Sequence, residues 1–117
     1  MQNNVLAFDQ FYRGDIEGAR RAFEALVREY PDFEWPYGNL GSLLIQVGDI
    51  DSARRVLDKA VSLNPYYTNA WLHLARLHAV TSDFDTAYEC LDRVAEIDPD
   101  EPAGASIRRA IAELASS

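Results

Sequence analysis

The feature of this sequence that most constrains its fold is an internal repeat with a period of 34 residues. Pro31, Pro65 and Pro99 follow one another at this step. Seven further columns hold similar residues at the same step, namely Leu6/Leu40/Leu74, Ala7/Gly41/Ala75, Gly14/Gly48/Ser82, Asp15/Asp49/Asp83, Ile16/Ile50/Phe84, Ala19/Ala53/Ala87 and Phe23/Leu57/Leu91. Three copies in register indicate a chain of stacked supersecondary units, each of which buries its apolar face against its neighbours.

Each column has a physical role that predicts helices. Gly14 and Gly48 can adopt the left-handed conformation that ends a helix, and the Asp that follows can accept hydrogen bonds at the start of the next helix. Small residues in the Gly41 and Ala53 columns let two helices approach closely, and the prolines end each unit because they cannot continue a helix. Apolar residues recur at helical spacing. We expect helices at 3–13, 16–29, 35–47, 50–63, 69–81, 84–97 and 103–115.

These columns resemble the tetratricopeptide repeat. The resemblance rests on Tyr37, Leu40, Gly41, Leu44, Gly48, Asp49, Ala53, Leu57, Ala60 and Pro65, and on the same series from Trp71 to Pro99. It implies an all-α fold, an α-solenoid of antiparallel helix hairpins wound into a right-handed superhelix of about seven helices. Residues 1–101 would form three repeats, at 1–33, 34–67 and 68–101, and residues 102–117 would form a C-terminal capping helix.

The last predicted helix departs from the repeat. Arg108 and Arg109 occupy the columns of Leu40 and Gly41, which suits a terminal helix with a solvated outer side. Its expected apolar stripe consists of Ile107, Ala110, Ile111 and Leu114. The helix expected at 3–13 has no such cap, so it would leave apolar surface open at the other end of the array.

Charge and composition exclude several classes of function. The net charge of −8, from 19 acids and 11 bases, disfavours nucleic acid and anionic membranes as partners. Cys90 is the only cysteine, so neither an intramolecular disulfide nor a cysteine metal cluster can form. No signal sequence and no run of roughly 18 apolar residues is present, and we expect a cytoplasmic location. Without a phosphate-binding loop, an activated nucleophile or metal-spaced acids, we expect no enzyme, cofactor or metal site.

The first helix of each hairpin would line a concave groove, where the family usually binds extended peptides. Residues 35–47 carry no charge, and residues 69–80 carry only Arg76 besides two histidines. By position the groove would present Asn4, Phe8, Trp35, Asn39, Ser42, Gln46, Asn69, His73 and Arg76, with Val5, Gly38, Ile45, Leu72 and Ala79 beside them. Asn39 and Asn69 could hold a peptide backbone, and Arg76 a carboxylate. The alternative is that an uncharged inner helix is simply well packed.

The two histidines are expected to serve different purposes. His73 and His78 are five residues apart, which places them about 140° apart around a helix and argues against a shared metal site. His73 shares its column with Asn39 and would contact a ligand or stay merely exposed. His78 shares its column with Leu44 and would pack in the core.

Three other features have competing interpretations. Trp71, in the column of Tyr37, should be a core residue, whereas Trp35 is either a binding anchor or packs across the turn at 33–36. Cys90 should be a small apolar filler. The Ala-Arg-Arg triplets at 19–21 and 53–55 should lie on a solvated convex face, with a secondary docking surface as the alternative.

The sequence therefore predicts a non-catalytic protein–protein interaction module, an adaptor or scaffold that binds a peptide in its groove. The alternatives are self-association through the uncapped N-terminal end, giving a homo-oligomer, or a repeat domain cut from a longer protein. One subtype of the family binds acidic chaperone tails through a clamp of Lys, Asn and Arg residues. Only Asn39 matches it, while Asn4, Phe8, Asn69 and His73 occupy the other clamp positions, which disfavours a chaperone-tail adaptor.

Overall fold

The computed structural model describes residues 15–116 of the chain, and this part folds into six α-helices. They are α2 (Ile16–Glu29), α3 (Glu34–Gln46), α4 (Ile50–Leu63), α5 (Thr68–Val80), α6 (Phe84–Ile97) and α7 (Pro102–Ala115). The predicted bounds of α2, α4 and α6 are confirmed, whereas α3, α5 and α7 begin one residue earlier than expected. In α7 the early start is favourable because Pro102 occupies the first turn, where its missing N–H costs little. The helix expected at 3–13 lies outside the described residues.

The aspartates of the repeat cap the second helix of each pair, as predicted. The carboxylates of Asp15, Asp49 and Asp83 accept hydrogen bonds from the backbone N–H groups of Gly18, Ser52 and Thr86, at 2.9, 3.4 and 3.3 Å. Each bond satisfies one of the free donors at a helix N-terminus. The same column therefore starts α2, α4 and α6 in the same way.

The first helices of two hairpins end on a residue in the left-handed region. Gly48 has a φ of 84° and Ser82 a φ of 64°. The N–H of the following residue then donates to the carbonyl of Leu44 at 2.9 Å in α3 and of His78 at 2.8 Å in α5. This is the six-to-one hydrogen bond of a Schellman ending, and it turns the chain sharply into the second helix.

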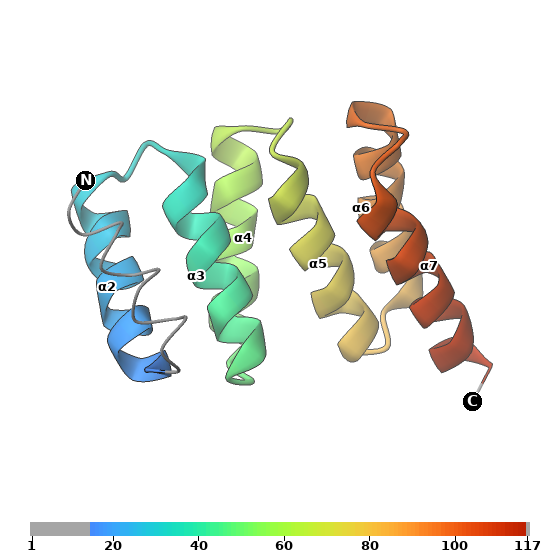
Figure 1. Cartoon of the computed structure of the whole chain (residues 1–117), viewed down its shortest axis with the longest axis horizontal. Helices are drawn as coiled ribbons and strands as arrows, with labels where there is room; N and C mark the ends of the chain where they lie inside the picture. Colours follow the sequence, from blue (N-terminus) through green and yellow to red (C-terminus); the bar gives the residue numbers. More distant parts are fainter. Residues whose placement is uncertain (1–14, 117) are drawn as a thin grey trace.

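The helices stack as hairpins in two layers (Figure 1). One layer consists of α3, α5 and α7, and α2, α4 and α6 lie behind it. Consecutive helices contact one another throughout, and α3 also contacts α5, as α5 contacts α7. The predicted all-α solenoid of antiparallel hairpins is therefore confirmed.

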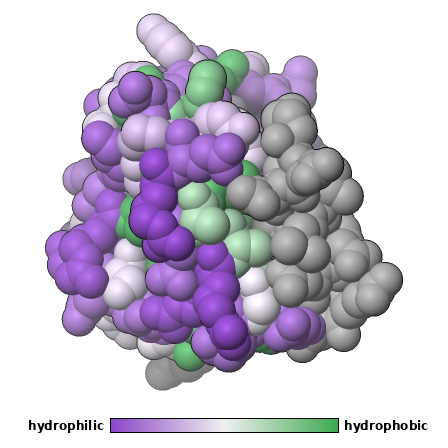
Figure 2. Space-filling model, turned by 90° about the vertical axis from the view of Figure 1, so that its left-hand side faces the viewer, coloured by the Kyte–Doolittle hydropathy of each residue, from purple (hydrophilic) through white to green (hydrophobic). Residues whose placement is uncertain are grey.

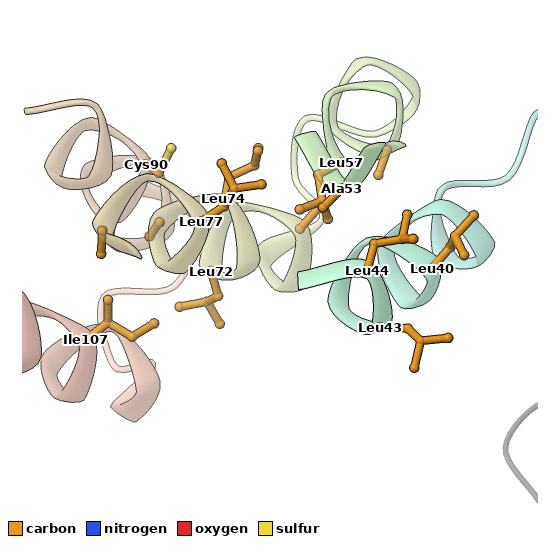
Figure 3. Packing of buried hydrophobic residues seen from close by; sticks show 14 of the residues in the cluster. Leu40, Leu43, Leu44, Ala53, Leu57, Leu72, Leu74, Leu77, Cys90 and Ile107 are labelled. Carbon is orange, nitrogen blue, oxygen red and sulfur yellow. The ribbon is translucent and has the colours of Figure 1, made fainter. Parts of the chain in front are cut away.

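Small and apolar repeat columns form the core between these layers. Ala19, Ala53 and Ala87 are fully buried, and Leu57 and Ala53 lie where α3, α4 and α5 meet (Figure 3). A Cβ atom added at Gly41 would collide with the Leu57 side chain, so α3 and α4 approach as closely as the small column predicted. None of the helices within 15–116 has the length and hydrophobicity that a membrane span requires.

The terminal helix α7 covers the end of the array with only part of the expected stripe. Ile107 and Ile111 are buried, but Ala110 is exposed and Leu114 is 51% exposed. The two buried residues, Ile107 and Ile111, are four positions apart, so the packed face of α7 is rotated away from the predicted one. Its position is also held by Arg108, which pairs with Asp92 of α6 at 2.9 Å and lies 5.8 Å from the ring centre of Tyr88.

The outer surface of α2 is solvated, as expected for the arginine triplets. Figure 2 shows that the α2 end of the molecule is mostly hydrophilic outside the grey residues. Arg21, Arg54 and Arg55 are exposed, and Arg20 pairs with the capping Asp49 at 3.2 Å. That ion pair joins α2 to the start of α4, so one arginine of the first triplet links neighbouring hairpins.

Candidate functional site

Seven of the predicted groove residues form one stripe on the neighbouring helices α3 and α5. Residues that follow one another at steps of four, three and four positions lie on one face of a helix. The members of the stripe follow these steps, and they are Trp35, Asn39, Ser42 and Gln46 on α3, and Asn69, His73 and Arg76 on α5. Gln46, Asn69 and Arg76 are exposed, and the other four are half-buried. We call these seven residues the inner face. Asn4 and Phe8, like Val5, lie outside the described residues.

Two residues expected to line the groove are buried instead. Leu72 is 6% exposed and Ala79 is 8% exposed. Leu72 lies on the side of α5 toward Ile107 of α7 (Figure 3), and α5 and α7 are in contact. The prediction was wrong for both residues because the capping helix covers this side of α5. Ile45 remains half-buried on α3.

Gly38 was expected to line the groove, but the side chain of Tyr67 occupies the space beside it. Gly38 is buried, and a Cβ atom added there would lie 2.6 Å from Cε2 and 3.0 Å from the hydroxyl oxygen of Tyr67. Burial raises the pKa of the Tyr67 hydroxyl, and a hydrogen bond with Asn69 of the inner face opposes this shift. Gly38 shares its column with Leu72 of α5. This missing side chain could have indicated the contact, because a glycine often accommodates an aromatic neighbour.

His73 and Arg76 lie side by side on the inner face and form a polar pair. The Nη1 atom of Arg76 lies 3.5 Å from Nδ1 of His73. A guanidinium only donates, so this contact is a hydrogen bond in the tautomer that carries its ring hydrogen on Nε2. Burial, and then the charge of Arg76, lower the pKa of His73 to about 4. His73 is therefore neutral at neutral pH and offers one N–H donor.

The Arg76 guanidinium keeps its charge available. No carboxylate of residues 15–116 lies within ion-pair distance of it. Among the inner-face residues it is the single full charge, and amide, hydroxyl and imidazole groups surround it along the stripe. The arrangement suits an extended ligand that offers backbone groups and one carboxylate.

Trp35 belongs to an aromatic cluster at the start of α3. Its ring centre lies 6.5 Å from that of Tyr30, which in turn lies 6.0 Å from Phe33. Trp35 thus packs across the turn at 33–36, which is one of the two interpretations given for it. Trp35 is nevertheless only half-buried, so part of its surface stays exposed.

The other side of α5 carries the second histidine. His78 is 18% exposed, with Nδ1 3.9 Å from Oδ2 of Asp83, and it lines a cleft together with Trp71 and Cys90. The structure therefore places the two histidines on different surfaces. Among residues 15–116, no three His, Cys, Asp or Glu side chains are grouped for a metal ion.

Trp71 and His78 were predicted to be core residues, but both are less buried than that. The Nε1 of Trp71 donates to the carbonyl of Pro65 at 2.8 Å, and the indole is half-buried. The helices α4 and α6, on either side, do not contact each other, so a cleft stays open above α5. Cys90 is 5% exposed as a filler should be, and burial raises the pKa of its thiol to about 11.

Comparison with known proteins identifies the same repeat. The family model described as tetratricopeptide repeat matches residues 10–65 and 44–111. No curated protein matches the chain.

Three solved structures illustrate the likeness of fold. The first TPR domain of Spaghetti (RPAP3), bound to the HSP90 peptide SRMEEVD, is 20% identical with a TM-score of 0.88, covering 98% of this chain and 94% of that one. The TPR2B domain of yeast Sti1, in a complex with pHsp70, is 21% identical with a TM-score of 0.82, covering 97% and 90%. The Arabidopsis OM64 TPR domain is 9% identical with a TM-score of 0.89, covering 95% and 92%. Such low identities extend the likeness to the fold alone.

Proposed function

Because the chain belongs to the tetratricopeptide repeat family, we propose that its inner face binds an extended segment of a partner protein and that it acts as an adaptor or scaffold. The observation that carries this proposal is the unpaired Arg76 guanidinium beside a neutral His73, in a stripe without other charges. A charge-assisted hydrogen bond to a ligand carboxylate is roughly twice as strong as a neutral one. Arg76 is therefore the group that would fix the position of the ligand.

The remaining inner-face residues suit a peptide main chain. Asn39 and Asn69 can each donate and accept, and the Nε2 hydrogen of His73 can reach a carbonyl oxygen. Ser42 and Gln46 extend the polar stripe along α3. Contacts of this kind hold a backbone with little regard to its side chains, and Arg76 then supplies the selectivity.

The proposed ligand is less acidic than the peptides bound by some relatives. The peptide SRMEEVD in the Spaghetti complex carries three acidic side chains. The inner face offers one guanidinium, and Asn69 and His73 stand at positions where the chaperone-tail clamp would carry other groups. We therefore propose a segment with one carboxylate opposite Arg76 and neutral residues around it.

Affinity purification with mass spectrometry tests the proposal. The wild-type chain is compared with the double variant Asn39→Ala, Arg76→Ala and with the control Arg28→Ala, an exposed arginine at the end of α2. We expect the control to retain the partner that the double variant loses. Peptides that tile this partner should then bind about tenfold more weakly to Arg76→Ala, the usual cost of one charged hydrogen bond. Equal capture by all three proteins would refute the proposal.

We retain the other sequence-based expectations as proposals. These are a cytoplasmic location, a binding role without a catalytic step, and the division into repeats at 1–33, 34–67 and 68–101 with a cap at 102–117. Self-association depends on the helix expected at 3–13, outside the described residues. Light scattering of the isolated chain decides that alternative, because a strictly monomeric mass at micromolar concentration removes it.

A further inference from the structure

A cleft opens on the side of α5 opposite the inner face, between α4 and α6. Its floor consists of Trp71, Leu74 and His78 of α5 with Cys90 of α6, and its volume is about 470 Å³. A second hollow of about 560 Å³ shares Trp71 with it and reaches Tyr66, whose side chain is 77% exposed. We call the two together the outer cleft. The function proposed above does not involve this surface.

Carboxylates surround the aromatic and apolar floor. Those lining the outer cleft are Asp58 of α4 and Glu89, Asp92 and Glu96 of α6. Arg93 is the only Lys or Arg of the lining, and it pairs with Glu96 at 3.0 Å. Asp58 and Glu89 have no ion-pair partner within residues 15–116. Both carboxylates add to the effect of burial in raising the pKa of Cys90, so their negative potential reaches the floor.

Because the repeats are 34 residues apart, each acidic residue of α6 can be compared with its counterpart in α4. One repeat earlier, the column of Glu89 holds Arg55 and the column of Glu96 holds Ser62. The helices α4 and α6 have the same length and the same capping residue, so folding does not require acids at these two positions. The acids at 89 and 96 are thus particular to the third repeat, whereas Asp58 and Asp92 share a column that also holds Glu24.

We propose that the outer cleft binds a basic segment of a partner protein, with a Lys or Arg side chain beside the Trp71 indole and paired with Asp58 and Glu89. Attraction of a cation to an indole adds to the ionic attraction when both are partly desolvated. The indole is held in place by its hydrogen bond to the Pro65 carbonyl, so little ordering is needed on binding. The occupant is opposite in charge to the ligand proposed for the inner face, and the two sites are therefore separable.

Tryptophan fluorescence can observe the outer cleft alone. The chain has two tryptophans, so Trp35→Phe leaves Trp71 as the single reporter. The probes are the capped peptide ARLRA and its acidic counterpart AELEA. We expect ARLRA to change the Trp71 emission saturably, and the affinity to fall as salt rises from about 0.05 to 0.5 M. AELEA should cause no saturable change.

Two charge-matched variants complete the test in the Trp35→Phe background. Glu89→Arg introduces the residue that the preceding repeat already carries in this column, and we expect it to weaken ARLRA binding about tenfold or more. Asp32→Arg makes the same change of charge at an exposed turn residue outside the cleft, and should alter the affinity less than about twofold. The proposal is overturned if ARLRA gives no saturable response, if AELEA gives an equal one, or if both variants weaken binding equally.

Discussion

The hairpins α3/α4 and α5/α6 share one framework but differ in the surfaces that they present. Their helices have equal lengths, and both bring an aromatic residue onto a proline carbonyl. Tyr37 donates to Pro31 at 3.0 Å, and Trp71 donates to Pro65 at 2.8 Å. The capping aspartates and the left-handed turn residues are likewise equivalent. Packing and backbone hydrogen bonding thus account for what the two hairpins have in common.

The differences that bear on the two proposed sites include positions where side chains reach solvent. On the inner face, Ser42 of α3 corresponds to the exposed Arg76 of α5. In the outer cleft, Arg55 corresponds to Glu89, and the buried Leu44 to the partly exposed His78. Substitutions that the framework does not require are the best indicators of function in a repeat protein. Arg76 of the inner face and Glu89 of the outer cleft are such positions.

The largest expected effect concerns the close contact within the first of these hairpins. Gly41→Ala should lower the free energy of unfolding by about 2 kcal/mol, because the added Cβ meets Leu57 near its branch point and the core must shift. The counterpart Ala75→Gly should cost only about 1 kcal/mol, from helix propensity. Urea unfolding followed by circular dichroism measures both. A Gly41→Ala protein as stable as wild type would show that glycine and alanine are interchangeable in this column.

A gain of binding tests the difference in inner-face charge. The double variant Asn69→Lys, His73→Arg adds two cations beside Arg76 and should raise the affinity for SRMEEVD about tenfold, as close charge pairs do across an interface. Isothermal titration calorimetry at low and high salt measures the change. The control Asp32→Lys changes the net charge by the same two units at an exposed turn residue, and it should have little effect. An unchanged affinity would mean that the inner face does not contact the peptide.

The pH dependence of stability tests the environment of His73, whose counterpart in α3 is Asn39. Its pKa is lowered from 6.5 to about 4 in the folded chain, so between these values the unfolded state binds more protons. The contribution is therefore fully present above pH 6.5 and is lost as the pH falls toward 4. His73→Asn should remove on the order of 1 kcal/mol of this acid sensitivity. The check is the urea midpoint at pH 7.5 and 5.0, and parallel shifts in both proteins would contradict it.

The framework could be predicted from sequence because local chemistry determines it. Helix bounds follow from the aspartate caps, the residues at the turns and the prolines, each of which acts within a few residues of its position. The inner-face stripe rests on the same helical spacing and the 34-residue step, and its role as a ligand groove stays a prediction. Those predictions needed no knowledge of how distant segments dock.

Predictions that depended on docking were less successful. Leu72 and Ala79 are buried because α7 covers α5, and the register gave no orientation for α7 once Arg108 and Arg109 had broken the pattern. The outer cleft was missed because it depends on the gap between α4 and α6, which share no sequence proximity. Tyr67 was missed because its effect on the groove depends on Gly38 of another helix.

The smallest expected effect lies at the turn where the hairpins differ by one residue. Ser82→Gly should raise the free energy of unfolding by about 0.5–1 kcal/mol, because a φ of 64° strains a side chain that glycine lacks. Gly48→Ser should lower it by a similar amount, since Gly48 has a φ of 84° and no atom lies near an added Cβ. Opposite shifts of the urea midpoint are expected, and shifts of the same sign would show that the serine hydroxyl, rather than the backbone angle, determines stability here.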